Sequence, residues 1–229
     1  MDAESQKASQ TKTSRIISTV LSPAVRLWLR SQVERVEALE FKITGGDRQI
    51  LTGNIPNISV AASQAIYQGL HLSQIQLEAT QIRVNLGQVI KGKSLRLLEP
   101  VPVTGQLTLS ETDLQASLKS QLLSTALSEF IGTFLTSPNL DFSWQKITID
   151  TGLLTLSGTF QAMPIVIIAG LQLASPHELL LDPFQIQMPS HAPKHLDGFQ
   201  VDLGSEVNLQ EITLTPGMLL CRGCLKILP

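Results

Sequence analysis

The sequence predicts an α+β fold in which a curved antiparallel β-sheet wraps around two long amphipathic helices. The prediction rests on two broad helical patterns, on many short strand patterns with short connections, and on an interior that is aliphatic. Of 229 residues, 43% are hydrophobic and 16% charged, while aromatic residues contribute only 4%. A chain of this length can bury a sizeable core. Aliphatic walls suit acyl chains, although the same composition describes any β-rich core.

The first helical pattern covers residues 14–38, and its apolar side chains gather on one side. The basic side chains gather on the opposite side: Arg15, Arg26 and Arg30. We expect a kink at Ser22-Pro23, because proline favours the first turn of a new helix. Two interpretations, which are compatible with each other, are that this helix covers the sheet with its arginines in water and that it meets anionic lipid with Trp28 at headgroup level.

The second helical pattern covers residues 110–136 and ends before Ser137-Pro138. Its apolar positions span roughly 200° of arc, which is broader than the stripe of an ordinary surface helix. Such a helix must be covered on more than one side. A sheet that curls around it would provide this cover, and any uncovered part could meet a lipid.

Strand patterns fill the remainder of the chain, separated by Gly, Pro, Asn and Lys. In the first half they cover residues 39–44, 49–62, 70–77, 81–86, 94–98 and 105–109. In the second half they cover residues 140–150, 153–174, 179–188 and 207–228, the last broken by Thr215-Pro216-Gly217. The Gly45-Gly46-Asp47 turn predicts a hairpin, and short connections favour an antiparallel sheet.

The order of helix, hairpin and further strands occurs twice. GLHLSQIQLEATQIRV from Gly69 and GLQLASPHELLLDPFQIQM from Gly170 share a Gly-Leu-x-Leu start. An internal helix-plus-strands repeat and the alternation common to amphipathic strands explain this similarity equally well.

We expect one domain after a disordered polar tail. The predicted boundaries are 1–13 for the tail and 14–229 for the domain, with halves at 14–109 and 110–229. Charge is uneven, because residues 1–96 hold 12 Lys/Arg and 7 Asp/Glu, whereas residues 97–229 hold 5 and 12. A basic end suits a surface that faces anionic lipid, although scattered solvated charges are the commoner explanation.

The sequence shows no catalytic, nucleotide or metal signature, so we expect a non-enzymatic protein without a cofactor. Cys221 and Cys224 are expected to be packed thiols in a turn, with a redox-sensitive or metal-sensitive pair as the alternative. His191 and His195 flank Pro193 and cannot share a regular helix face. Few aromatic residues and no Lys/Arg run argue against nucleic-acid binding.

The longest apolar stretch, residues 163–174, is too short to span a bilayer and contains Pro164 and Gly170. The polar first fifteen residues are a poor match to a signal peptide. We therefore expect a cytoplasmic protein that sits peripherally on a membrane.

Three stretches resemble a known family. They are SRIISTVLSPAVRLWLRSQV at residues 14–33, the region 45–118 that begins GGDRQILTGNIPNISV, and LTPGMLLCRG at residues 214–223. Together they resemble the bacterial LmeA-like phospholipid-binding family, long described as a domain of unknown function. The resemblance implies phospholipid binding and an elongated sheet around long helices, as in tubular lipid-binding domains. It also implies an exported protein associated with envelope lipids, whereas this sequence shows no export signal.

We predict a phospholipid-binding protein that holds acyl chains in an aliphatic groove at an anionic membrane surface, for lipid transfer or membrane-lipid homeostasis. The alternatives are a scaffold or partner-binding protein and, less supported, an enzyme. The predicted acyl-chain contacts lie on both helices and one strand: Val20, Leu27, Leu122, Ala126, Phe130, Phe134, Ile165 and Ile167. The predicted headgroup or membrane contacts lie on the first helix: Arg15, Arg26, Trp28 and Arg30.

Overall fold

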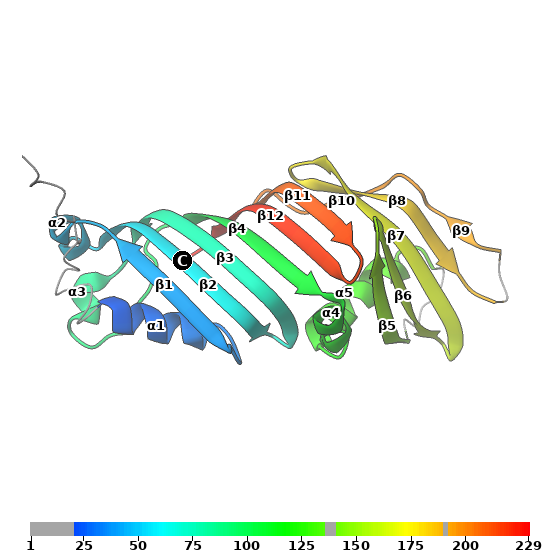
Figure 1. Cartoon of the computed structure of the whole chain (residues 1–229), viewed down its shortest axis with the longest axis horizontal. Helices are drawn as coiled ribbons and strands as arrows, with labels where there is room; N and C mark the ends of the chain where they lie inside the picture. The colour runs from blue at the N-terminus through cyan, green and yellow to red at the C-terminus, as the bar shows by residue number, and fades with distance from the viewer. Residues whose placement is uncertain (1–20, 136–140, 190–191) are drawn as a thin grey trace, which may run out of the picture.

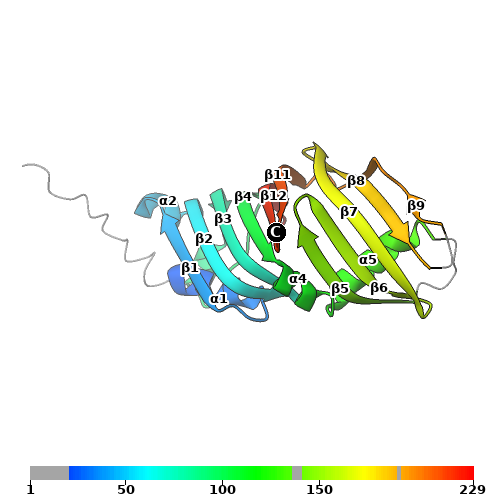
Figure 2. The same cartoon turned by 45° about the vertical axis from the view of Figure 1, so that its right-hand side comes forward.

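The computed structural model describes residues 21–135, 141–189 and 192–229. Its strands form two open antiparallel sheets that follow one another along an elongated molecule (Figures 1 and 2). Short helices accompany both sheets. Those in the described ranges are α1 (Ser22–Ser31), α2 (Asp47–Leu51), α3 (Leu86–Val89), α4 (Glu111–Ser117) and α5 (Gln121–Gly132).

The first sheet combines strands from both ends of the chain. In spatial order it contains β1 (Ala38–Thr44), β2 (Asn54–Tyr67), β3 (Leu70–Arg83), β4 (Val101–Ser110), β12 (Met218–Ile227) and β11 (Val207–Thr215). The last strand therefore returns to pair with β4, from Val101 opposite Ile227 to Ser110 opposite Met218.

The second sheet is built from the middle of the chain. In spatial order it contains β10 (Phe199–Asp202), β8 (Glu178–Gln187), β7 (Met163–Ser175), β6 (Leu153–Phe160) and β5 (Phe142–Asp150). The two-residue strand β9 (Lys194–His195) also pairs with β8.

Each sheet has its own hydrophobic core. In the first, α1 packs on what we call the inner face of the first sheet, which carries Val101 and Val103. In the second, α5 packs on β5 to β8 together with the near ends of β4 and β12. Leu109 and Leu219, on those near ends, belong with the second core. Side chains alternate between faces along a strand, so β4 and β12 carry one apolar face from the first core into the second.

Helix α4 connects the two sheets through its polar side chains. The Glu111 carboxylate accepts a hydrogen bond from the Ile149 N–H (2.8 Å), and the Gln115 side-chain oxygen accepts one from the Ile147 N–H (2.9 Å). On the other side, Ser73 of β3 donates to the Asp113 carboxylate (2.5 Å). The edge strand β5 and the central strand β3 are thus tied to one helix.

The buried Asp113 carboxylate is stabilised as an anion. Burial by itself raises its pKa, but hydrogen bonds from Ser73, Ser110 and Gln64, together with the nearby His71, outweigh burial and leave the pKa below its ordinary value. Ser110 also caps α4, because its hydroxyl accepts a hydrogen bond from the Asp113 N–H (3.1 Å).

The predicted fold class is wrong: the described residues are mostly antiparallel strand with short helices, and neither of their sheets wraps around two long helices. Helix α1 has 10 residues and α5 has 12, and the two sheets are separate and open. The expected helix over residues 110–136 is divided between α4 and α5. Ser120 begins the second of these, since its hydroxyl accepts a hydrogen bond from the Leu123 N–H (3.1 Å).

The first predicted helix is also shorter than residues 14–38, of which residues 14–20 lie outside the described part. The helix ends at Ser31, because the chain then becomes extended beside β2. The Glu34 N–H donates to the Ile66 carbonyl (2.8 Å), and the Ile66 N–H donates to the Arg35 carbonyl (2.8 Å). This pairing replaces further helical turns.

Most strand predictions are confirmed, with four differences. Residues 70–77 and 81–86 belong largely to one long strand, β3, and residues 153–174 form two strands joined at Gln161 and Ala162, which both have positive φ. Helix α2 interrupts the predicted strand at 49–62. Residues 94–98 make only an isolated bridge between Val84 and Leu97.

The two similar sequence segments do not occupy equivalent elements. The one that begins at Gly69 is a single strand, β3, whereas the one that begins at Gly170 contains the end of β7, a turn and β8. Each half nevertheless contains one helix on the face of an antiparallel sheet. Across the described residues, none of the helices has the length and apolar character needed to cross a bilayer.

Candidate functional site

An apolar groove lies between α1 and the inner face of the first sheet. It consists of a cavity of about 760 Å³ and an adjoining one of about 90 Å³ that share several lining residues. We call the two together the inner groove. Its volume lies in the range typical of ligand pockets, roughly 300–1,000 Å³.

The walls of the inner groove are aliphatic because strand side chains alternate between faces. The residues that line both cavities are Trp28, Leu29, Val60, Leu77, Leu95, Leu97 and Ile227. The larger cavity extends along β2 and β3 to Ala62, Ala65 and Ile75. The smaller one ends at Ile55, Ile82 and Val103. A surface of this kind binds an apolar ligand by burial of methylene groups.

Polar groups lie at the rim of the larger cavity. They are Gln32, Tyr67 and Arg96. The backbone of Arg96 is fixed, because its N–H donates to the Asn85 side-chain oxygen (2.8 Å). Its exposed guanidinium has no ion-pair partner within the described ranges. Arg96 can therefore meet an anionic group of a ligand held in the groove.

The inner face of the second sheet is filled. Four phenylalanine rings contact one another there, with centroid separations of 4.9–6.1 Å: Phe130, Phe134, Phe184 and Phe199. Phe184 is 1% exposed, and Ile165 and Ile167 beside it are also buried. These side chains use the space that the first sheet leaves open.

The structure separates the predicted acyl-chain contacts into three groups. Phe130, Phe134, Ile165 and Ile167 belong to the second core. Leu122 and Ala126 line a shallow hollow on the exposed side of α5, and Leu27 is 73% exposed on α1. Val20 lies outside the described residues. Lipid contact at these positions stays a prediction, and the residues do not line one common cavity.

The predicted headgroup contacts also differ in position. Trp28 lines the inner groove. The Arg26 guanidinium lies 5.5 Å from the centroid of the Phe41 ring, and Arg30 is exposed on α1. Arg15 lies outside the described part of the chain.

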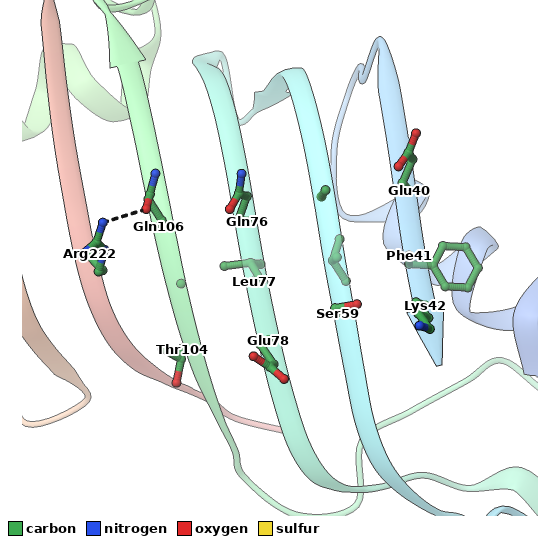
Figure 3. A pocket seen from close by; sticks show the side chains of 13 residues that line it. Glu40, Phe41, Lys42, Ser59, Gln76, Leu77, Glu78, Thr104, Gln106 and Arg222 are labelled. Atoms are coloured by element: carbon green, nitrogen blue, oxygen red, sulfur yellow. Dashed lines mark hydrogen bonds between the residues drawn. The ribbon is translucent and has the colours of Figure 1, made fainter. Parts of the chain in front are cut away.

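A second hollow, of about 490 Å³, lies on the opposite, outer face of the first sheet (Figure 3). Its side chains are largely polar and of both charges, and several already have partners. Arg222 pairs with Glu211 (3.1 Å) and donates to Gln106 (3.1 Å), and Asn57 donates to Glu78 (2.6 Å). This open, mixed surface lacks the apolar character of the inner groove.

The cysteines and histidines that the structure describes do not form a reactive cluster. Cys221 and Cys224 lie in β12 rather than in a turn, on opposite faces of the strand. Burial raises the pKa of the Cys221 thiol, which disfavours the nucleophilic thiolate. His195 lies 3.9 Å from Asp197, and His191 is outside the described ranges. Among the residues described, no group of three or more His, Cys, Asp or Glu side chains could hold a metal ion.

An elongated open sheet with an aliphatic groove and an arginine at its rim defines a binding module for an amphipathic ligand. The chain belongs to the LmeA-like phospholipid-binding family, whose model matches residues 12–224. This match confirms the family resemblance of the sequence and supports lipid binding in general. No curated protein and no solved structure shows significant similarity to the chain.

Sequence reasoning identified the chemistry of the site but missed most of its residues. Of the residues that line both cavities, only Trp28 was predicted to meet a ligand. The distribution of phenylalanines along the sequence could have indicated that the second core is filled and that the first sheet leaves a groove. Six of the seven phenylalanines contact the second core, and only Phe41 lies in the first.

Proposed function

We propose that the protein binds a phospholipid whose acyl chain lies in the inner groove and whose phosphate meets Arg96 at the rim. The single observation that carries this proposal is a groove of about 760 Å³ with aliphatic walls in a chain of a phospholipid-binding family. Burial of about ten methylenes would contribute roughly 8 kcal/mol before the cost of ordering the chain.

The proposed role is non-catalytic. The polar side chains at the rim, Gln32, Tyr67 and Arg96, include neither a carboxylate nor an imidazole. Ser73 and Asp113, which are buried, form hydrogen bonds with each other and with Ser110 at the junction of the sheets. We propose that the protein carries or presents a lipid at an anionic membrane surface, in lipid transfer or membrane-lipid homeostasis.

The test is native mass spectrometry with lipid extraction on protein purified without detergent. Ala62 lines the groove, whereas its neighbour Ala61 points to the outer face of β2. We expect phospholipid on the wild type and on Ala61→Trp, and its loss from Ala62→Trp, because an indole at position 62 occupies the groove.

Circular dichroism and thermal unfolding establish that both variants are folded. Equal lipid occupancy in the two variants would show that the ligand lies elsewhere. A wild type that carries no lipid and takes up none from anionic vesicles would contradict the proposal and favour a partner-binding scaffold.

A further inference from the structure

Two short helices form the end of the molecule that is farthest from the second sheet. Helix α2 lies between β1 and β2, and α3 follows β3, so both are at the same end of the first sheet (Figure 1). They are neighbours because the Val84 N–H donates to the Gly53 carbonyl (2.8 Å), next to the paired residues Asn54 and Arg83. We call residues 47–52 and 86–94 the tip.

The tip is anchored by one set of aliphatic side chains and exposes another. Ile50 and Leu86 are 0% and 1% exposed and belong to the first core. Leu51 and Ile90 are 54% and 57% exposed. Large aliphatic side chains exposed on two neighbouring helices are a common feature of an interaction surface.

The charges of the tip are mainly positive. Arg48, Lys91 and Lys93 are exposed, and the one acidic residue in the tip sequence is Asp47, which gives a net charge of +2. None of the three cations forms an ion pair with a residue whose side chain the structure describes, and the Asp47 side chain is not among these. Exposed aliphatic residues flanked by cations complement a surface that is anionic outside and apolar inside.

The tip is continuous with the inner groove. Lys93 is followed within four residues by Leu95, Arg96 and Leu97, all of which line the larger cavity. Cations therefore extend along the chain from the tip to the rim of the groove. A lipid that leaves a bilayer at the tip has a short path to aliphatic walls.

We propose that the tip is the surface by which this protein docks on an anionic phospholipid bilayer. Leu51 and Ile90 enter the boundary between headgroups and acyl chains, and Arg48, Lys91 and Lys93 contact lipid phosphates. This inference rests on the proposed function, because docking at this end is useful only if the groove takes up lipid from the bilayer beside it. It differs from the sequence-based expectation that the arginines of α1 make the membrane contact.

The test is flotation with vesicles of phosphatidylglycerol and phosphatidylcholine, which contain no protein partner. Lys91→Gln/Lys93→Gln is expected to weaken binding about 30-fold, from roughly fivefold for each cation near an anionic surface. Leu51→Ser/Ile90→Ser is expected to weaken it roughly tenfold or more, because the inserted aliphatic groups are lost. The matched control Lys119→Gln/Lys146→Gln removes two exposed cations elsewhere and is expected to bind like the wild type.

Soluble short-chain phosphatidylglycerol below its micellar concentration separates docking from groove binding. Tip variants are expected to keep their affinity for this probe, whereas Ala62→Trp is expected to lose that affinity and keep vesicle binding. Groove binding without any effect of the tip variants on flotation would overturn the docking inference and leave the proposed function intact. If flotation depends on the tip but the wild type does not bind short-chain phosphatidylglycerol, the docking inference stands and the proposed groove binding is wrong.

A further variant, Leu27→Ser/Arg30→Gln, removes exposed groups from α1. If this variant loses vesicle binding while both tip variants retain it, α1 is the docking surface and the inference is wrong. The same conclusion follows if neutral and anionic vesicles bind the wild type equally.

Discussion

The two sheets have similar apolar inner faces and differ in what covers them. Under the second sheet, α5, the turn that follows it, and strands β8 and β10 contribute four mutually packed phenylalanine rings. Under the first, the ten-residue helix α1 contributes Val25, Trp28 and Leu29, and an open groove remains. A strand pattern therefore predicts an apolar face but does not predict whether that face is filled by the protein or left for a ligand.

The largest expected difference concerns removal of buried volume. Phe184→Ala is expected to lower the free energy of unfolding by about 3–5 kcal/mol, because the ring is fully enclosed. Leu77→Ala, on the floor of the groove, is expected to cost about 1–2 kcal/mol, since its side chain already borders open space. Urea unfolding measures the free energy of unfolding of the two variants. Similar losses would mean that the first sheet is as tightly packed as the second.

The junction between the sheets should make stability depend on pH. The pKa of Asp113 is lower in the folded than in the unfolded state, so its contribution is present above the unfolded pKa and is lost as pH falls through the folded one. Asp113→Asn is expected to cost about 1–3 kcal/mol at pH 7 and to flatten the acid limb of the stability profile.

Denaturant unfolding between pH 7 and pH 3 measures this effect. The exposed Asp141→Asn is the control and is expected to follow the wild type. If Asp113→Asn leaves the acid limb of the stability profile unchanged, the Asp113 carboxylate does not stabilise the junction between the sheets.

Substitutions that add volume should also distinguish the two halves, again with the larger loss of stability in the second core. Phe130→Trp is expected to cost about 1–3 kcal/mol, because its ring already contacts Phe134, Phe184 and Phe199. Ala62→Trp is expected to cost less than about 1 kcal/mol, since the groove has room for the indole. Thermal unfolding compares the two variants without lipid. A larger cost at position 62 would show that the groove closes in solution.

The smallest expected effect is on affinity. Arg96→Gln is expected to weaken binding of short-chain phosphatidylglycerol about tenfold, through loss of one partly exposed charge-assisted hydrogen bond. Its fold should be unaffected, because the contact to Asn85 uses the backbone. Calorimetric titration measures the change, with Lys119→Gln as the control. An unchanged affinity would place the headgroup away from Arg96.

Local signals made much of the sheet predictable. The Thr215-Pro216-Gly217 turn separates β11 and β12 as expected, and Gly217 has the positive φ (76°) that such a turn favours. The division of the second helix was not predicted, since the apolar residues Leu118 and Leu122 keep helical spacing across the break. The hydroxyl of Ser120 ends that continuity by capping a new helix.

The groove could not be predicted from local patterns. Val60 and Leu77 lie in the consecutive strands β2 and β3, but Ile227 comes from the far end of the sequence, and their common wall depends on β12 returning beside β4. The openness of the groove depends on the end of α1 at Ser31, which is set by pairing of the following residues with β2. The position of β12 and the end of α1 both depend on tertiary contacts, which local sequence patterns do not reveal.

The two tryptophans of the chain offer the most direct test of the central claim that lipid binds under the first sheet. Trp28 lines the inner groove, whereas Trp144 is 9% exposed in the second core, where its N–H donates to Ser128 (3.1 Å). The measurement is fluorescence quenching by a phospholipid with brominated acyl chains, in Trp144→Phe and in Trp28→Phe. We predict strong quenching when Trp28 remains and little when Trp144 remains. Quenching of Trp144 alone would place the acyl chain under α5 and contradict the account.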